Sequence, residues 1–337
     1  MRPQQQAASP PLQSDGSEPG IVRTYSFLAP STGFLADVQA GLAAPRKLLP
    51  ARWRYDEMGL RALEALSGAP EFYLARHERA LLAAHLTEAA EVMDRNPQLI
   101  EIGPACGLQT GMLIEALQPP LYLNIAIDEA AAEAAAGRLS AAYPRLHIAG
   151  MLADPTVPLV LPEFAGMNTR RKALFLSAAA AGSYTPDELS MLLRCARHIA
   201  GAGGTLITAI DLKKSRKVLE AAGNDAQGLA AHWNAALLQR INRELGGDFQ
   251  TARFSHVAVH DEMLGCTGFY LESDYAQFVN VGGRRFDFAV EEVMLTGIAS
   301  QYSVGEFETL VGEAGFKVEK IWTDAAKWMA LCLLVAV

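Results

Sequence analysis

Residues 98–110, QLIEIGPACGLQT, join a short apolar run to a turn with two glycines, which leads into a helix-like stretch. Glycine permits a sharp turn and lets a ligand approach the backbone closely. Farther along the chain, apolar runs alternate with helical stretches, which is typical of an open parallel sheet with helices on both faces. These runs are LIEIG, LYLNIAID, LHIAGML, ALFLSAA and GTLITAID. We therefore expect an α/β protein with a doubly wound, mostly parallel sheet.

Two acidic residues follow successive strands of this expected sheet. Asp128 ends LYLNIAID, and Asp154 follows LHIAGMLA. Ligands of doubly wound sheets bind beyond the carboxyl ends of the strands, where one carboxylate can accept from ribose hydroxyls and another from the adenine amine. Helix capping explains each aspartate alone, but it explains less well why both follow the turn at Gly103. We predict adenosine binding, and the lack of a full G-x-G-x-x-G favours S-adenosylmethionine over a dinucleotide.

The remaining chain is expected to form a cap of helices and antiparallel strands beside this core. Residues 35–95 carry apolar side chains at helical spacing, whereas FSHVAVHDEM, GFYLES and RFDFAV read as strands. We expect a disordered tail over 1–22, a helical part of the cap over 23–90, a cofactor-binding core over 91–214, a substrate or cap domain over 215–300 and a return to the core sheet over 301–337.

The composition argues against several classes of partner. The net charge is −8 and the basic residues are scattered, so the footprint of a nucleic-acid binder is missing. The longest apolar run, residues 328–337, is about half of the roughly 20 residues that a membrane-spanning helix needs, and we expect a buried terminal strand. The N-terminus lacks the pattern of a secretory signal, and the four cysteines form no Cys-x-x-Cys pair. We expect a cytoplasmic protein without a membrane or nucleic-acid partner.

From about residue 33 to its end, the chain resembles the histidine-specific Nα-methyltransferases of ergothioneine biosynthesis. The matching stretches are LPARWRYDEMG, APEFYLARHE, LIEIGPACGLQT, AIDLKKS, NDAQGLAAHWNAALLQRINRELGGDF, VMLTGIASQYS and IWTD. Members of that family use S-adenosylmethionine, have the class I methyltransferase fold and carry a separate substrate-binding domain. The resemblance implies that fold, that cofactor and a small-molecule substrate for a monomer or homodimer.

The resemblance also implies residues of the site. It supports Tyr55, Gly103, Asp128 and Asp154 as cofactor contacts, and it puts Trp233 and Asn234 beside the acceptor pocket. The cofactor-binding residues that we expect are Tyr55, Gly103, Ala105, Gly107, Asp128, Asp154 and Ser177. The catalytic residues that we expect are Tyr55, Phe72, Tyr73, Ser183, Tyr184 and Trp233. No metal is expected.

The sequence departs from the family at the cofactor turn and at the acceptor pocket. The family's Gly-Ser-Gly is replaced by Gly103-Pro104-Ala105, and its lysine is absent. The positions that bind histidine in the family are here Phe72, Ser183, Gly223, Gly297 and Ala299. Each replacement removes or shortens a polar group, and a hydrogen bond to a charged group contributes about 1.5–3 kcal/mol. We predict that L-histidine is not a substrate and that the small residues open room for a bulkier or less polar amine.

Three functions are compatible with these changes. The favoured one is methyl transfer to an amine of another acceptor, which depends on positioning and desolvation of that amine. The second is a cyclase in which the cofactor's own amine attacks its γ-carbon, giving azetidine-2-carboxylate and methylthioadenosine. Aromatic faces would assist it through cation–π contacts of about 0.5–2 kcal/mol each, although the aromatic residues also fit a packed core. The third is a non-catalytic relative, against which the retained Asp128 and Asp154 argue.

Other reactive side chains have plainer interpretations. His256 and His260 alternate along an expected strand and could share one face, but exposed strand faces often carry such residues. Cys106 lies in the cofactor turn, where a helix N-terminus can lower a thiol pKa, yet it reads better as a small packing residue. Ser177 and Ser183 lack His and Asp partners in the sequence, so nucleophilic catalysis is not supported.

Overall fold

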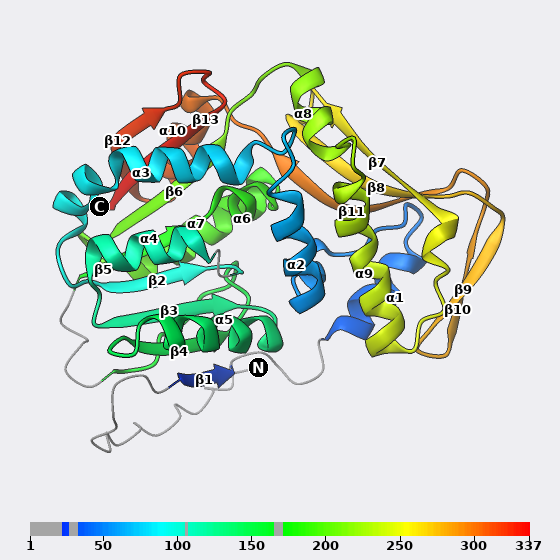
Figure 1. Ribbon diagram of the computed structural model, residues 1–337, viewed down its shortest axis with the longest axis horizontal. Helices are drawn as coiled ribbons and strands as arrows, with labels where there is room; N and C mark the ends of the chain where they lie inside the picture. Colours follow the sequence, from blue (N-terminus) through cyan, green and yellow to red (C-terminus); the bar gives the residue numbers. More distant parts are fainter. Residues whose placement is uncertain (1–21, 27–32, 105–106, 165–170) are drawn as a thin grey trace, which may run out of the picture.

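A computed structural model describes residues 22–26, 33–104, 107–164 and 171–337. Within these ranges, eight strands form one sheet in the order β1-β4-β3-β2-β5-β6-β13-β12 (Figure 1). The first six strands in this order run parallel, and β13 lies antiparallel between β6 and β12. The strands are β1 (Val22–Ser26), β2 (Gln98–Ile102), β3 (Leu121–Ala126), β4 (His147–Leu152), β5 (Lys172–Leu176), β6 (Thr205–Asp211), β12 (Phe316–Thr323) and β13 (Met329–Ala336). The expected doubly wound, mostly parallel sheet is confirmed.

Helices cover both faces of this sheet, which explains why β2 and β3 are buried at every position. On one face, Leu189 and Phe307 belong to an apolar cluster that includes Leu174 and Leu206 of the sheet. The helices there are α6 (Ala178–Gly182), α7 (Pro186–Ala200) and α10 (Val304–Glu313). The opposite face is covered by α3 (Leu74–Met93), α4 (Leu108–Leu117) and α5 (Glu129–Ala142). The core is therefore two apolar layers with the sheet between them.

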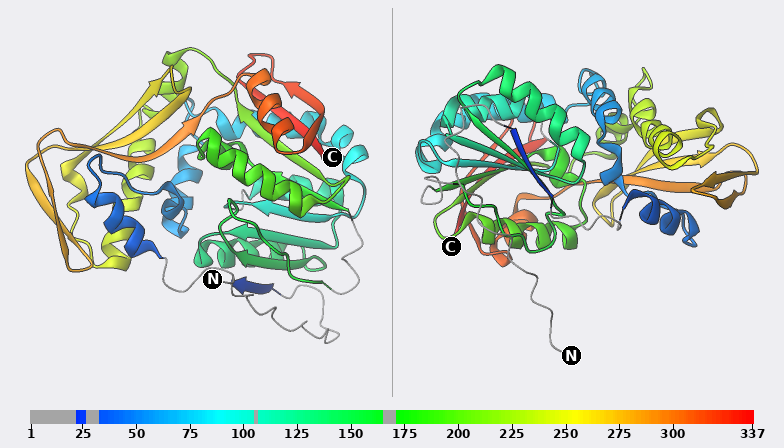
Figure 2. Two further views of the ribbon diagram at one scale, coloured as in Figure 1. Left: turned by 180° about the vertical axis from the view of Figure 1, so that it is seen from behind. Right: turned by 90° about the horizontal axis from the view of Figure 1, so that it is seen from below.

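The cap lies beside one end of the sheet, as Figures 1 and 2 show. Its strands are β7 (Phe254–Asp261), β8 (Cys266–Ser273) and β11 (Val293–Ser300) in one antiparallel sheet and β9 (Gln277–Val281) and β10 (Arg284–Phe288) in a hairpin. Its helices are α1 (Phe34–Ala43), α2 (Glu57–Leu66), α8 (Arg216–Gly223) and α9 (Leu229–Leu245), with the short turns η1 (Ala51–Arg54) and η2 (Thr251–Arg253). Val38, Leu237 and Leu271 pack together inside it. The cap thus has an apolar core of its own.

Two segments lie elsewhere than the sequence suggests. Helix α3, expected in the cap, packs on the main sheet, where Leu82 and Leu86 join a cluster with Leu331. Residues 22–26, which span the expected boundary between tail and helical cap, instead form strand β1, which pairs with β4 at the edge of the main sheet. The apolar stripe of a helix predicts that one face is buried, but it does not identify the surface that covers it.

The apolar C-terminal run forms the expected buried strand. Strand β13 lies between β6 and β12, and nearly every residue in it is buried. Among the helices of the described ranges, none combines the length and apolarity that crossing a membrane requires.

Candidate functional site

A cavity of about 190 Å³ lies at the carboxyl ends of β2, β3 and β4. Gly103 follows β2, Asp128 follows β3 and Asp154 follows β4, and all three line the cavity. Parts of the cap and the end of α6 complete the wall with Pro50, Ala51, Arg52, Tyr55, Ser183 and Tyr184. The structure therefore brings together six of the residues that the sequence proposes for the site.

Gly103 has a backbone conformation that requires glycine. Its φ is +100°, and a Cβ at this position would lie 3.2 Å from the Cβ of Ala180. Its amide donates to the carbonyl of Ile125, and its carbonyl accepts from the side-chain amide of Asn124 at 2.9 Å. The turn is thus held on both sides at the mouth of the cavity.

The next glycine of the turn lies away from the cavity. Gly107 has φ +55° and is the residue before α4, but it does not line the cavity. Ala105 and Cys106 fall outside the described residues. The structure consequently places only the first glycine of the expected cofactor turn at the cavity.

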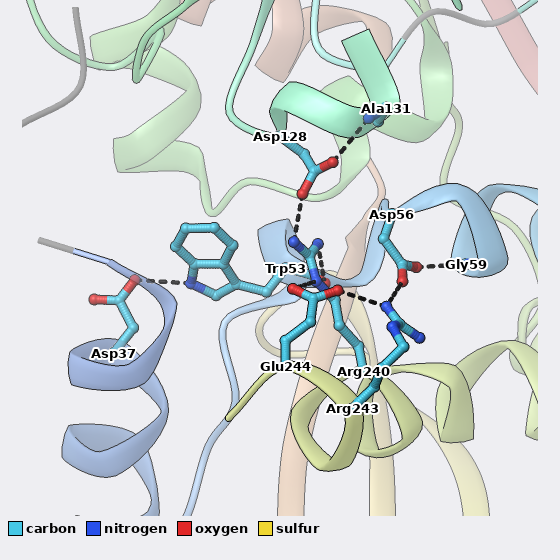
Figure 3. Close-up of polar contacts among 9 residues, drawn as sticks. All are labelled: Asp37, Trp53, Asp56, Gly59, Asp128, Ala131, Arg240, Arg243 and Glu244. Carbon is cyan, nitrogen blue, oxygen red and sulfur yellow. Dashed lines mark hydrogen bonds and ion pairs between the residues drawn. The ribbon is translucent and has the colours of Figure 1, made fainter. Parts of the chain in front are cut away.

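Asp128 both caps a helix and lines the cavity. Its Oδ1 accepts from the amide of Ala131 at 2.9 Å, so it is the N-cap of α5. Its Oδ2 forms an ion pair with Arg240 of α9 (Figure 3). An ionised carboxylate offers about four acceptor positions, so two are left for hydroxyl groups of a ligand.

Asp154 opens a turn instead of a helix. Its Oδ1 accepts from the amide of Thr156 at 2.9 Å and from the hydroxyl of the same residue at 2.7 Å. Among the described residues, none donates to its Oδ2. Helix capping thus does not account for Asp154, and one oxygen is free to accept from an amino group of a ligand.

Two tyrosines add aromatic surface to the cavity. Burial, followed by the negative charge of Asp154, raises the pKa of Tyr184 above its ordinary value, so this phenol stays protonated. The ring of Tyr55 lies 6.5 Å from that of Trp233, between centroids. The hydroxyl of Ser183, which also lines the cavity, donates to the carbonyl of Ala180 at 2.7 Å.

Besides Gly107, four of the proposed residues do not line the cavity. Tyr73 is buried and donates to both carboxylate oxygens of Asp211, at 2.8 and 2.9 Å. Burial and that neighbouring charge raise the pKa of Tyr73. Ser177 caps α6 by accepting from the amide of Ala180. Phe72 and Trp233 belong to an apolar cluster between α2, α9 and the cap sheet. Their positions fit packing and capping roles better than direct contact with a ligand.

Two of the small residues that replace the family's polar groups, Gly223 and Gly297, do not open space. A Cβ at Gly223 would lie 2.5 Å from the Cβ of Ala258. At Gly297 it would lie 3.2 Å from Nη2 of Arg54. The expectation of a widened pocket at these two positions is wrong, because neighbouring groups fill the volume.

Arg54 fills this region with a buried charge. The residue is 2% exposed, and its guanidinium carbon lies 4.2 Å from the centroid of the Trp233 ring. It donates to the carbonyl of Thr296, while no described residue is a hydrogen-bond partner of its Nε. Burial lowers the pKa of Arg54 to about 10, so it is protonated at neutral pH. The positive charge of Arg54 therefore lies beside Gly297, one of the positions where the family resemblance predicts a group that binds the imidazole.

The two histidines of β7 make hydrogen bonds to other residues of the cap. The Nε2 of His256 lies 2.7 Å from the carbonyl of Gly223, and its Nδ1 lies 3.0 Å from the side-chain amide of Asn234. These partners match a neutral ring that donates from Nε2, and burial lowers the pKa of His256. The Nδ1 of His260 lies 3.2 Å from the hydroxyl of Thr267. In the described part of the chain, no group of three or more residues could hold a metal ion.

Sequence reasoning missed Arg54 and Arg240. Each had a usable signal. Arg240 falls between Leu237, Leu238 and Ile241, all fully buried in α9, and an arginine in such a stripe indicates a specific partner. Arg54 stands between aromatic residues in RWRYDEM. The identity of each partner depends on contacts more than 100 residues away along the chain, which local patterns do not encode.

A doubly wound sheet with a glycine turn and two acids around one cavity at its carboxyl edge defines a nucleoside-binding α/β protein. Residues 34–336 match the model of the histidine-specific, S-adenosylmethionine-dependent methyltransferases. The chain belongs to this family, and S-adenosylmethionine is its cofactor. The residues present fit that group, since Gly103 permits close approach of a ligand and Asp128 and Asp154 have acceptor positions that a ribose and an adenine amine could use.

The chain is less than 30% identical to each of three individual proteins that it resembles. The histidine N-alpha-methyltransferase of Mycolicibacterium smegmatis is 29% identical over 305 residues, which cover 89% of this chain and 94% of that protein. The 4-dimethylallyltryptophan N-methyltransferase of Penicillium roqueforti is 26% identical over 305 residues, 85% of this chain and 88% of that protein. A methyltransferase of known structure from Clostridium acetobutylicum has a TM-score of 0.48 and 11% identity, covering 82% of this chain and 98% of that one.

Proposed function

We propose that the protein transfers the methyl group of S-adenosylmethionine to an amine of a small acceptor other than histidine. The observation that carries this proposal is the packing of Arg54 against Gly297. A buried guanidinium there disfavours a protonated imidazole, because like charges at short distance repel strongly in a low-dielectric interior. One relative is named for an acceptor, dimethylallyltryptophan, that is not histidine.

The chain's own residues would act by positioning and by excluding water. S-adenosylmethionine supplies a methyl carbon activated by a sulfonium. Asp128 and Asp154 would hold the adenosine, and Tyr55 and Tyr184 would close the cavity around the reacting end. Positioning and desolvation of an unprotonated amine supply most of the acceleration in such a displacement. As part of the same proposal, we place the protein in the cytoplasm and divide its chain into a core domain and a cap domain.

A second candidate, a cyclase, is supported by Tyr55 and Tyr184, which line the cavity, and by the altered turn Gly103-Pro104-Ala105. Without a separate acceptor, the amine of S-adenosylmethionine could attack its own γ-carbon. A C–N bond would form, the C–S bond would break with its electron pair leaving on methylthioadenosine, and the amine would lose a proton. The product would be azetidine-2-carboxylate, and the rings of Tyr55 and Tyr184 would face the sulfonium.

One product analysis separates these candidates. Purified protein is incubated with S-adenosylmethionine alone, with L-histidine, and with a panel of primary and secondary amines, and products are identified by mass spectrometry. Methyl transfer predicts S-adenosylhomocysteine only when a suitable amine other than histidine is present. Methylthioadenosine and a cyclic amino acid from the cofactor alone would instead support the cyclase. Methylated histidine at the rate of other amines, or no turnover under any condition, would contradict the proposal.

A further inference from the structure

Arg240 links the cap to the cavity through a buried ion pair. It belongs to α9, and its guanidinium meets the carboxylate of Asp128 beyond β3, with both side chains 8% exposed (Figure 3). We propose that Arg240 is a positioning residue that sets the Asp128 carboxylate for the cofactor ribose and fixes the cap against the core at the same point. This inference rests on the cofactor placement proposed above.

The guanidinium of Arg240 is fixed by contacts other than Asp128. Its Nη1 donates to the carbonyl of Trp53 at 3.0 Å, and its Nε donates to Oε2 of Glu244 at 2.9 Å. Its Cζ also lies 4.9 Å from the ring centroid of Phe34. A group held on three sides has few other rotamers, so it constrains the carboxylate that it contacts.

The same guanidinium holds the cap side of the cavity. The Trp53 carbonyl belongs to η1, the turn that contributes Ala51 and Arg52 to the cavity wall. The indole nitrogen of Trp53 donates to Oδ2 of Asp37 at 2.8 Å, which ties the turn to α1 (Figure 3). Arg240 therefore joins the ribose-facing carboxylate and the opposite wall through one side chain.

The ion pair leaves Asp128 able to bind a ligand. Oδ1 accepts from Ala131, Oδ2 accepts from Arg240, and a carboxylate has about four acceptor positions. The pair orients the carboxylate without using up its acceptor capacity.

The test compares two arginines of the same helix. Arg240→Met removes the contact with Asp128. Arg240→Lys keeps the positive charge but loses the planar, multidentate donor geometry of the guanidinium. Arg243→Met is the control, because Arg243 pairs with Asp56 and Glu244 and has no contact with Asp128. S-adenosylhomocysteine binding is measured by calorimetry, KM and kcat are measured in the turnover assay, and thermal unfolding verifies that each variant is folded.

We expect Arg240→Met to raise Kd and KM about tenfold or more with little change in kcat, because it leaves a buried carboxylate unpaired. Arg240→Lys should fall between this variant and wild type, which also covers the case that Arg240→Met does not fold. Arg243→Met should keep Kd and KM within about twofold of wild type, because Arg243 does not contact Asp128. Removing the 2′-hydroxyl from the ligand should also cost less affinity in Arg240→Lys than in wild type.

Two results would overturn the inference. Tighter binding by Arg240→Met would mean that the arginine competes with the ribose, and an unchanged Kd would mean that it does not position Asp128. Asp128→Ala separates these results from a failure of the proposed site. If Asp128→Ala leaves Kd unchanged, the cofactor placement itself is wrong; if it weakens binding and both Arg240 variants do not, only the role of Arg240 falls.

Discussion

Glu78 is a buried carboxyl that no part of the proposed chemistry uses. It lies in α3, where it accepts from the amide of Ala178 at 2.8 Å and from the side-chain amide of Gln109 at 3.1 Å. Burial raises its pKa to about 7 against the opposing effect of these two hydrogen bonds. Its contacts join α3 to α4 and to the start of α6 beside the cavity.

This shift predicts a pH-dependent stability. Because the folded pKa of Glu78 exceeds its unfolded pKa of about 4.5, the folded state binds more protons between these values. The stabilisation is fully present below the unfolded pKa and is lost as the pH rises through 7, by up to roughly 3 kcal/mol at 1.36 kcal/mol per pKa unit. Urea unfolding at pH 5 and pH 8 should therefore show a larger fall in the free energy of unfolding for wild type than for Glu78→Gln. An equal fall in the free energy of unfolding for both proteins would show that Glu78 is not responsible for the pH dependence.

Individual residues of the site were predictable where they follow a strand. Gly103, Asp128 and Asp154 were found because the ends of parallel strands meet at one edge, and the structure brings them to one cavity. Tyr73 was assigned to catalysis, but its hydroxyl donates a hydrogen bond to Asp211, and only the fold reveals that partner. The role of Arg54 was not predicted, because the residues next to it in the sequence do not indicate that it contacts Thr296 and Gly297.

Helix α8 ends against the cap sheet in a way that only glycine allows. A Cβ at Gly223 would overlap the Cβ of Ala258 in β7, whereas a Cβ at Gly312 of α10 would meet nothing within 4 Å. Gly223→Ala should destabilise the protein by about 1–3 kcal/mol through overpacking. Gly312→Ala should stabilise it by roughly 0.5–1 kcal/mol through helix propensity. Denaturant unfolding of both variants measures these effects, and a stabilising Gly223→Ala would contradict the packing described here.

The type of most elements was readable from the sequence, but the placement of some was not. Continuous apolar runs identified β2 to β6 because both faces of the sheet are covered. The stripe of α3 was equally clear, yet it was assigned to the cap instead of the sheet that buries Leu82. Strand β1 follows no strong apolar pattern in VRTYS, and its pairing depends on the edge that β4 offers.

Core and cap together decide what the cavity can hold. The sheet supplies Gly103, Asp128 and Asp154, and the cap supplies Tyr55 together with the η1 turn. Arg240 connects the two parts, while Arg54 occupies the region beside Gly297. Membership of a histidine-specific family is thus combined with a site in which, as we propose, the groups that recognise histidine are replaced.

Calorimetric titration of L-histidine into protein saturated with S-adenosylhomocysteine tests this conclusion most directly. Saturation fills the cofactor site, so heat reports on the acceptor side alone. With Arg54 beside Gly297, we predict no saturable heat at histidine concentrations up to about 1 mM, the level at which a binding free energy of about −4 kcal/mol would be detected. Saturable binding of one histidine per chain at micromolar concentrations would contradict the account.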